Sequence, residues 1–185
     1  MPEKSKYFRG QLLLDSGRLQ GSFFQRTVVL ICQHDAEGAF GLVLNRSTGS
    51  KVGEMIVADL PDTIKECPLY LGGPVQPTAL SFLHSENFDP GANVLPNLNL
   101  GHSLDALLDI GESFSADKKI RMFAGYAGWS GGQLEDEMKQ NAWLVVDAAA
   151  DDAIIFGGDH TGKWGDAIKR LGFDPGQIAG ETGRA

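Results

Sequence analysis

Short apolar runs separated by turn-forming residues dominate the first half of the chain. Residues 27–33 are β-branched and apolar, residues 39–45 are apolar again, and the residues between them favour a turn. This pattern predicts an antiparallel hairpin in which Gly38 is free to adopt a positive φ. Similar runs predict five further strands, at residues 11–14, 68–71, 79–84, 120–127 and 143–146.

Helical spacing is confined to short stretches. A helix is predicted over 52–60, where it is stopped by Pro61, and Ser103 is a plausible N-cap for a second. Two more are predicted at 133–140 and 164–171. The two glycines and two prolines of 72–77 predict a rigid bend without regular structure, 93–101 is expected to be irregular, and 148–156 fits a helix or a strand. Strands dominate the first half of the chain, and helices interleave with strands in the second half. This order predicts an α+β fold with a mixed sheet.

The composition is that of one globular domain. The chain has 185 residues, of which 42% are apolar and 22% charged, so it is long enough to bury its own core without disulfides or a metal. We therefore expect a single domain over 1–185, with a C-terminal helical extension at 160–175. Glycine is abundant, at 24 residues, which indicates many tight turns and close backbone approaches.

The charge balance restricts the partners. The net charge is -8, and residues 52–117 contain ten acidic residues against one basic residue, Lys65. This balance disfavours nucleic acid and anionic membranes as partners. The N-terminal residues are polar, no long apolar run is present, and the two cysteines lack metal-ligand spacing. These features together predict a cytoplasmic protein. Cys32 ends an apolar run and is expected to be a buried core thiol.

A Gly-x-Ser-x-Gly sequence at 128–132 lies between a predicted strand and a predicted helix, as the nucleophile elbow of serine hydrolases requires. Ser130 would be the nucleophile and His160 the base, with an acid among Asp147, Asp151 and Asp152. However, an early antiparallel hairpin leaves little room for the long parallel sheet of that fold. We keep this hydrolase as an alternative and favour a turn of small residues.

Residues 157–163 have the Gly-x-x-x-x-Gly-Lys spacing of a phosphate-cradling loop. Trp164 occupies the position where that loop needs a magnesium-binding hydroxyl, and Asp159 adds negative charge inside it. We therefore favour an ordinary helix entry over nucleotide binding. The four histidines are His34, His84, His102 and His160, and none has the spacing of a metal ligand with a neighbour. Neither a metal nor another cofactor is therefore predicted.

Six of these segments together resemble the AlgH/YqgE family of bacterial proteins, namely residues 23–29, 37–45, 71–75, 125–129, 132–135 and 141–144. The resemblance covers about residues 10–156. It implies a largely antiparallel, bifurcated sheet that forms a pseudo-barrel flanked by helices. Members are often named as transcriptional regulators, but the family implies no established enzymatic activity. Many relatives have glycine at the position of Ser130, which argues against a nucleophile there.

The resemblance also implies a set of recurring positions, which we take as candidate ligand-binding residues: Asn45, Gly72, Gly73, Pro74, Gly128, Trp129, Gln133 and Glu135. Glycines permit close approach, and polar groups beside an indole are typical of a recognition pocket. We expect the two glycine-rich bends to converge on one concave surface edged by Trp129. Alternatively, the same residues close turns and cap the helix after Gly132.

The function expected from this set is regulation through binding of an unidentified small molecule or protein, rather than catalysis. The serine hydrolase and a DNA-binding regulator remain as alternatives, the second disfavoured by charge.

Overall fold

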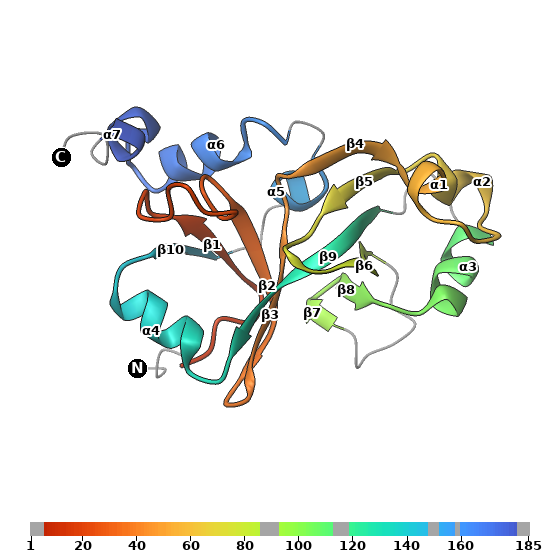
Figure 1. Cartoon of the computed structure of the whole chain (residues 1–185), viewed down its shortest axis with the longest axis horizontal. Coiled ribbons are helices and arrows are strands. Elements are labelled where there is room, and N and C mark those ends of the chain that lie inside the picture. Colours follow the sequence, from red (N-terminus) through yellow and green to blue (C-terminus); the bar gives the residue numbers. More distant parts are fainter. Residues whose placement is uncertain (1–5, 86–92, 113–118, 148–151, 158–159, 181–185) are drawn as a thin grey trace.

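The computed structural model describes residues 6–85, 93–112, 119–147, 152–157 and 160–180 (Figure 1). Its strands are β1 (Gln11–Asp15), β2 (Val28–Asp35), β3 (Gly38–Val43), β4 (Ser47–Lys51), β5 (Pro68–Leu71), β6 (Val75–His84), β7 (Asn93–Leu95), β8 (Leu98–Gly101), β9 (Ile120–Ser130) and β10 (Trp143–Asp147). Its helices are α1 (Val52–Met55), α2 (Asp62–Lys65), α3 (Leu104–Glu112), α4 (Gln133–Lys139), α5 (Asp152–Phe156), α6 (Lys163–Arg170) and α7 (Pro175–Gly180). Among these residues, no helix is both long and apolar enough to cross a membrane.

The sheet forks at β9, which runs through the middle of Figure 1. The strand order is β10-β1-β2-β3-β9-β6-β8-β7, and the β4–β5 pair joins at β9. β3 pairs with the second half of β9, where Gly41 faces Ala127, and β5 pairs in parallel with the first half, where Leu71 faces Ala124. The other described pairings are antiparallel. The predicted α+β fold with a bifurcated, curled sheet is therefore confirmed.

Helices cover three apolar clusters that the sheet leaves on its faces. Ile168 of α6 packs into the largest cluster, Leu134 of α4 into the second, and Leu107 of α3 into the third. All three side chains are fully buried, which stabilises each helix by roughly 1.5–3 kcal/mol per side chain. In Figure 1, α6 and α7 lie at the upper left, α4 at the lower left, and α1, α2 and α3 at the right.

The hairpin predicted around Gly38 is present as β2 and β3. Gly38 has φ +143°, and Leu30 faces Leu42 across the ladder. A register shift between Ile31 and Gln33 makes the hairpin irregular. The Ser103 N-cap is also confirmed, because its hydroxyl accepts a hydrogen bond from the Ala106 N–H at 3.3 Å.

Three local predictions were wrong. The helix predicted over 52–60 ends at Met55, because the chain turns extended at Ile56 to bury Leu60 from a loop. The bend at 72–77 extends only to Pro74, since β6 begins at Val75 and accommodates its proline in a register shift before Leu80. The segment 93–101 is a hairpin of β7 and β8, in which Asn97 adopts φ +62°. The ambiguous stretch 148–156 is helical from Asp152 on, and residues 148–151 lie outside the described ones.

Candidate functional site

Gly72 and Gly73 lie where the sheet forks. The Gly72 N–H donates to Ala124 O at 2.9 Å, and Gly72 O accepts from the Val43 N–H at 2.8 Å, so one residue joins β3, β5 and β9. A Cβ on Gly73 would lie 2.0 Å from the carbonyl carbon of Tyr126. The 72–74 bend therefore does approach β9, but it does so through backbone packed on backbone.

Trp129 does not edge an open surface, and that expectation was wrong. Its side chain belongs to the cluster under α4, and the residue is only 7% exposed. Its indole N–H donates to Glu137 Oε2 at 2.9 Å. Because side chains alternate along a strand, the register of β9 turns Trp129 toward α4, and Gly128 lies on the opposite face against the Tyr126 ring.

Gln133 closes the turn between β9 and α4. Its Oε1 accepts from the N–H and the hydroxyl of Ser130, at 3.1 and 3.3 Å, and its amide donates to Glu137 Oε1 at 3.2 Å. These bonds fit the alternative interpretation of the candidate residues, in which they close turns rather than bind a ligand. Ligand binding by Gln133 stays a prediction.

The hydrolase alternative is not supported by the geometry. The His160 ring packs edge-on against Tyr70, with the ring centroids 6.1 Å apart, and Tyr70 pairs with Phe123 near the start of β9. Ser130 ends the same strand seven residues later, about 23 Å away at the usual rise. Because His160 packs on Tyr70 near the opposite end of β9, it is out of reach of the Ser130 hydroxyl.

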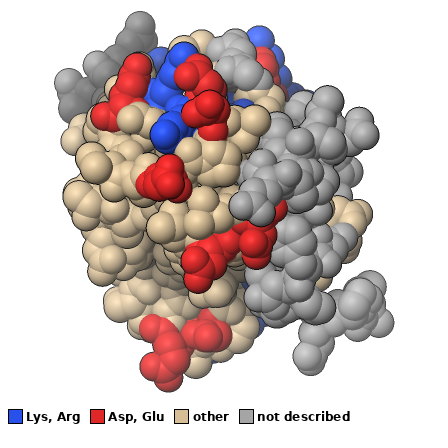
Figure 2. All heavy atoms as spheres, turned by 90° about the vertical axis from the view of Figure 1, so that its right-hand side faces the viewer, with Lys and Arg blue, Asp and Glu red and all other residues tan. Residues whose placement is uncertain are grey.

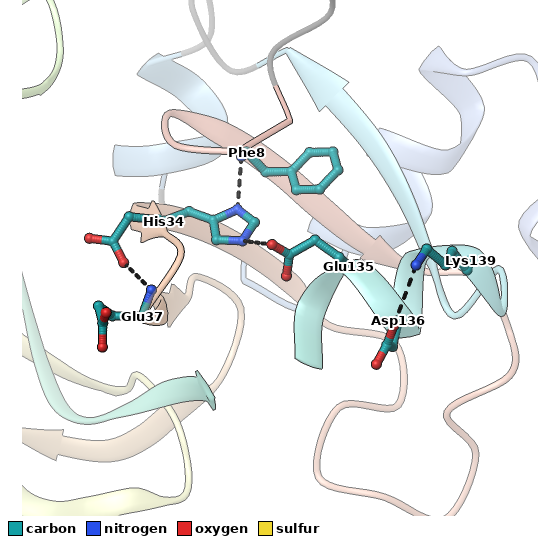
Figure 3. A network of polar contacts seen from close by, with 7 residues as sticks. Phe8, His34, Glu37, Glu135, Asp136 and Lys139 are labelled. Carbon is teal, nitrogen blue, oxygen red and sulfur yellow. Dashed lines mark hydrogen bonds and ion pairs between the residues drawn. The ribbon is translucent and has the colours of Figure 1, made fainter. Parts of the chain in front are cut away.

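Glu135 takes part in a polar contact that ties the N-terminal segment to α4 (Figure 3). His34 Nδ1 accepts from the Phe8 N–H at 3.0 Å, so the neutral ring carries its proton on Nε2, which lies 3.3 Å from Glu135 Oε1. A hydrogen bond from the Glu135 backbone amide, at the start of α4, and the His34 contact lower the pKa of Glu135. The Phe8 ring stacks on the imidazole, so this contact is closed to ligands from that side.

Lys163 does not act as a phosphate-binding lysine. It is buried, and its Nζ donates to Ile154 O at 2.7 Å, near the carboxyl end of α5. Trp164 is also buried and donates its indole N–H to Asp15 O at 3.0 Å. Asp159 lies outside the described residues. Within the part of the chain that is described, no group of three or more His, Cys, Asp or Glu side chains could share a metal ion.

A pocket of about 930 Å³ opens beside α6, and we call it the α6 pocket. One wall comes from the β1–β2 loop and the segment that links β3 to β4, and the other from the start of α6 and the start of α7. Its described lining is Ser22, Phe23, Gln25, Arg26, Asn45, Arg46, Ser47, His160, Thr161, Gly162, Trp164, Gly165, Pro175 and Gly176. Asn45 and His160 had been singled out from the sequence; the two arginines had not.

Arg26 and Arg46 make the α6 pocket basic. Arg26 precedes β2 and Arg46 lies between β3 and β4, and Arg46 Nη2 donates to the carbonyl of Gln25, the neighbour of Arg26. Neither Asp nor Glu occurs among the described lining residues. Partial burial lowers the pKa of Arg46, an effect that the charge of nearby Asp15 opposes.

The opposite end of the molecule carries the reverse charge. Figure 2 shows the face at the right of Figure 1, where Asp and Glu side chains are scattered from the upper part to the lower edge and Lys and Arg gather near the upper edge. Exposed acidic residues of α1, α2, α3 and their loops include Glu54, Asp59, Asp62, Glu66, Asp105 and Asp109. The arginine pair is therefore a local exception in an acidic protein.

Fold and pocket together define an α+β protein with a forked, curled sheet and a basic pocket beside its C-terminal helices. The AlgH-like family matches residues 12–176, and the chain belongs to that family. This match extends past the predicted limit of residue 156 to include α6.

Relatives cover nearly the whole chain. A UPF0301 protein of Rhodopseudomonas palustris (strain HaA2) is 36% identical over 197 residues, which span 99% of this chain and 89% of the relative. A UPF0301 protein of Shewanella denitrificans is 36% identical over 184 residues, which span 95% of this chain and 97% of the relative.

Solved structures support the same fold. The solution structure of the AlgH protein from Pseudomonas aeruginosa is similar with a TM-score of 0.75 and 30% identity, covering 100% of this chain and 98% of that one. A crystal structure of a Corynebacterium diphtheriae protein has a TM-score of 0.71 at 23% identity, over 96% and 92% of the two chains.

Proposed function

We propose that the protein binds a small anionic molecule in the α6 pocket, and that any regulatory role acts through occupancy of this pocket rather than through catalysis. The observation that carries the proposal is the arginine pair, Arg26 and Arg46, on one wall of a pocket without Asp or Glu among its described lining residues.

Size and charge both favour such a ligand. Pockets for small molecules usually enclose about 300–1,000 Å³, and 930 Å³ falls inside that range. Both arginines line the same pocket, so a bound anion would interact with two positive charges at once. The net charge of -8 favours a small anion over a nucleic-acid backbone, which the acidic faces would repel.

A thermal-shift screen tests the proposal. Anionic metabolites of several classes and neutral analogues are added to the whole protein, and the native state is stabilised only if it binds them. At a concentration of about 100 times Kd, binding adds ~2.7 kcal/mol to the free energy of unfolding, enough to raise Tm by several degrees. Arg46→Gln should reduce the shift, and Arg18→Gln, which removes an exposed charge outside the pocket, should not. A panel in which no anion raises Tm contradicts the proposal.

A further inference from the structure

Arg26 has an unusual backbone for a non-glycine residue. Its φ is +54°, in the left-handed region that side chains with a Cβ rarely adopt. Such a conformation persists only where the surrounding structure holds it, and strained residues of this kind cluster at binding sites. Arg26 is also the residue whose guanidinium lies over the Trp164 ring, with Cζ 5.7 Å from the ring centroid.

Two buried polar side chains hold this conformation. Asp15 Oδ2 accepts from the Arg26 N–H at 2.7 Å, and Asn45 Nδ2 donates to Arg26 O at 2.8 Å. Asp15 is 1% exposed and Asn45 is 5% exposed. Both backbone polar groups of Arg26 are therefore fixed by side chains from the ends of β1 and β3.

The same arrangement fixes the second arginine beside the first. Arg46 follows Asn45 in the chain, and its Nη2 donates to Gln25 O, the carbonyl that precedes Arg26. Asn45 and Arg46 thus bind the carbonyl groups of two consecutive residues in the β1–β2 loop. The backbone of Arg26 and the side chain of Arg46 are thus held before any ligand arrives, which reduces the entropy lost on binding.

We infer that the ligand of the α6 pocket carries a phosphate group bound by Arg26 and Arg46 together, and that Asp15 and Asn45 are positioning residues for Arg26. This inference rests on the proposed function. A phosphate monoester presents three terminal oxygens and a charge of about -1.5 to -2, whereas a carboxylate presents two oxygens and one charge. Two planar guanidinium groups match the first better, because two bidentate contacts can share its three terminal oxygens, whereas a carboxylate has only two.

The rest of the pocket indicates a small organic phosphate rather than the inorganic ion. The volume of about 930 Å³ far exceeds that of one phosphate, and Phe23 and Pro175 add apolar lining. The start of α6 lies in the facing wall, and its dipole favours an anion. Lys163 takes no part, because it is bonded to Ile154 O.

Calorimetric titration of the whole protein with phenyl phosphate and with benzoate, at low ionic strength, tests the phosphate. We expect phenyl phosphate to bind at least tenfold more tightly. Arg26→Gly removes the guanidinium while relieving the backbone strain, so this variant should fold and should bind phenyl phosphate at least tenfold more weakly. Arg18→Gln loses the same charge from an exposed position and should bind like the parent protein.

The outcomes separate the inference from the proposed function. Equal affinity for the two probes, or unchanged binding by Arg26→Gly, overturns the phosphate inference and leaves an anion pocket. Failure of both probes and of every anion in the thermal-shift screen overturns both.

The positioning role has its own test in a double-mutant cycle. Asn45→Ala, or Asn45→Asp if the alanine variant does not fold, should weaken phenyl phosphate binding about tenfold when Arg26 is present. In the Arg26→Gly background it should have little further effect, since no guanidinium remains to be positioned. An equal loss of affinity in both backgrounds would show that Asn45 acts only on the fold and would overturn its positioning role.

Discussion

Trp129 and Trp143 donate their indole N–H groups to the same atom, Oε2 of Glu137, at 2.9 and 2.8 Å. The two rings pack edge-on with centroids 6.2 Å apart, so one carboxylate of α4 satisfies two buried donors from β9 and β10, which are separated by β1, β2 and β3 in the strand order. The indole that the sequence suggested for a ligand is thus already bound within the protein.

Glu137→Ala should destabilise the protein substantially. Removing the carboxylate leaves two buried N–H groups without an acceptor, and each costs about 1–3 kcal/mol, so we expect the free energy of unfolding to fall by roughly 2–6 kcal/mol. Urea denaturation measures it. Asp136→Ala, which removes a neighbouring carboxylate that is 71% exposed, should change the free energy of unfolding by less than about 0.5 kcal/mol. Equal effects of the two variants would refute the shared-acceptor account.

Gly73→Ala should destabilise the protein far more than Gly132→Ala, because the two glycines are needed for different reasons. A Cβ at position 73 would meet the backbone of Tyr126 at 2.0 Å, so the fork of the sheet cannot form without moving a strand. Gly132 has φ +81° and open space around it, so alanine there costs only about 1–2 kcal/mol. We expect little soluble folded Gly73→Ala and a folded Gly132→Ala by circular dichroism. A stable Gly73→Ala variant would show that the close approach is not required.

Acid should weaken the Glu135 contact. The pKa of Glu135 is lowered in the folded state, so the carboxylate stabilises the protein above its ordinary pKa of 4.5. This stabilisation is lost as the pH falls below 4.5 through the folded-state pKa. The difference in free energy of unfolding between the parent and Glu135→Gln should therefore shrink across that window. Glu37→Gln, at an exposed hairpin position, serves as the control; a difference that stays constant with pH contradicts the assignment.

The two cysteines should differ in reactivity toward a disulfide reagent such as DTNB. Burial raises the pKa of Cys32, which is 1% exposed, and also raises that of the less buried Cys67. Since the thiolate is the reactive form, Cys67 should react slowly in the native protein and Cys32 only on unfolding. Two thiols that react rapidly without denaturant would show that β2 opens in the native state.

Features encoded over a few residues were predictable from the sequence. The β2–β3 hairpin and the Ser103 cap depend on neighbouring residues, and both are present. The β7–β8 hairpin was missed because its turn uses Asn97, rather than glycine, at a positive φ. The fork at Gly72 depends on contacts with β3 and β9, which lie far away in the sequence, and was implied only by the family resemblance.

The candidate site was harder to predict for two physical reasons. Burial alternates along the second half of β9, where Gly128 and Ser130 are exposed and Trp129 is buried, but the small residues of this stretch do not reveal that alternation in the sequence. The arginine pair was obscured by the acidic average charge, although Arg26 and Arg46 flank the two strands of the predicted hairpin. The two residues are brought together by the positive φ of Arg26 and by the bond from Arg46 to Gln25 O, neither of which a sequence pattern shows.

We expect ligands to bind in the α6 pocket and not at the Gly72–Gly73 bend. The most direct measurement is a titration of the ¹⁵N-labelled protein with phenyl phosphate, followed through its amide chemical shifts. We predict saturable shifts at Arg26, Arg46, Ser47, Gly162 and Gly165, with the amides of Gly72, Gly73, Gly128 and Trp129 unmoved. Saturable shifts centred on the second group, with the first group unmoved, would contradict the account.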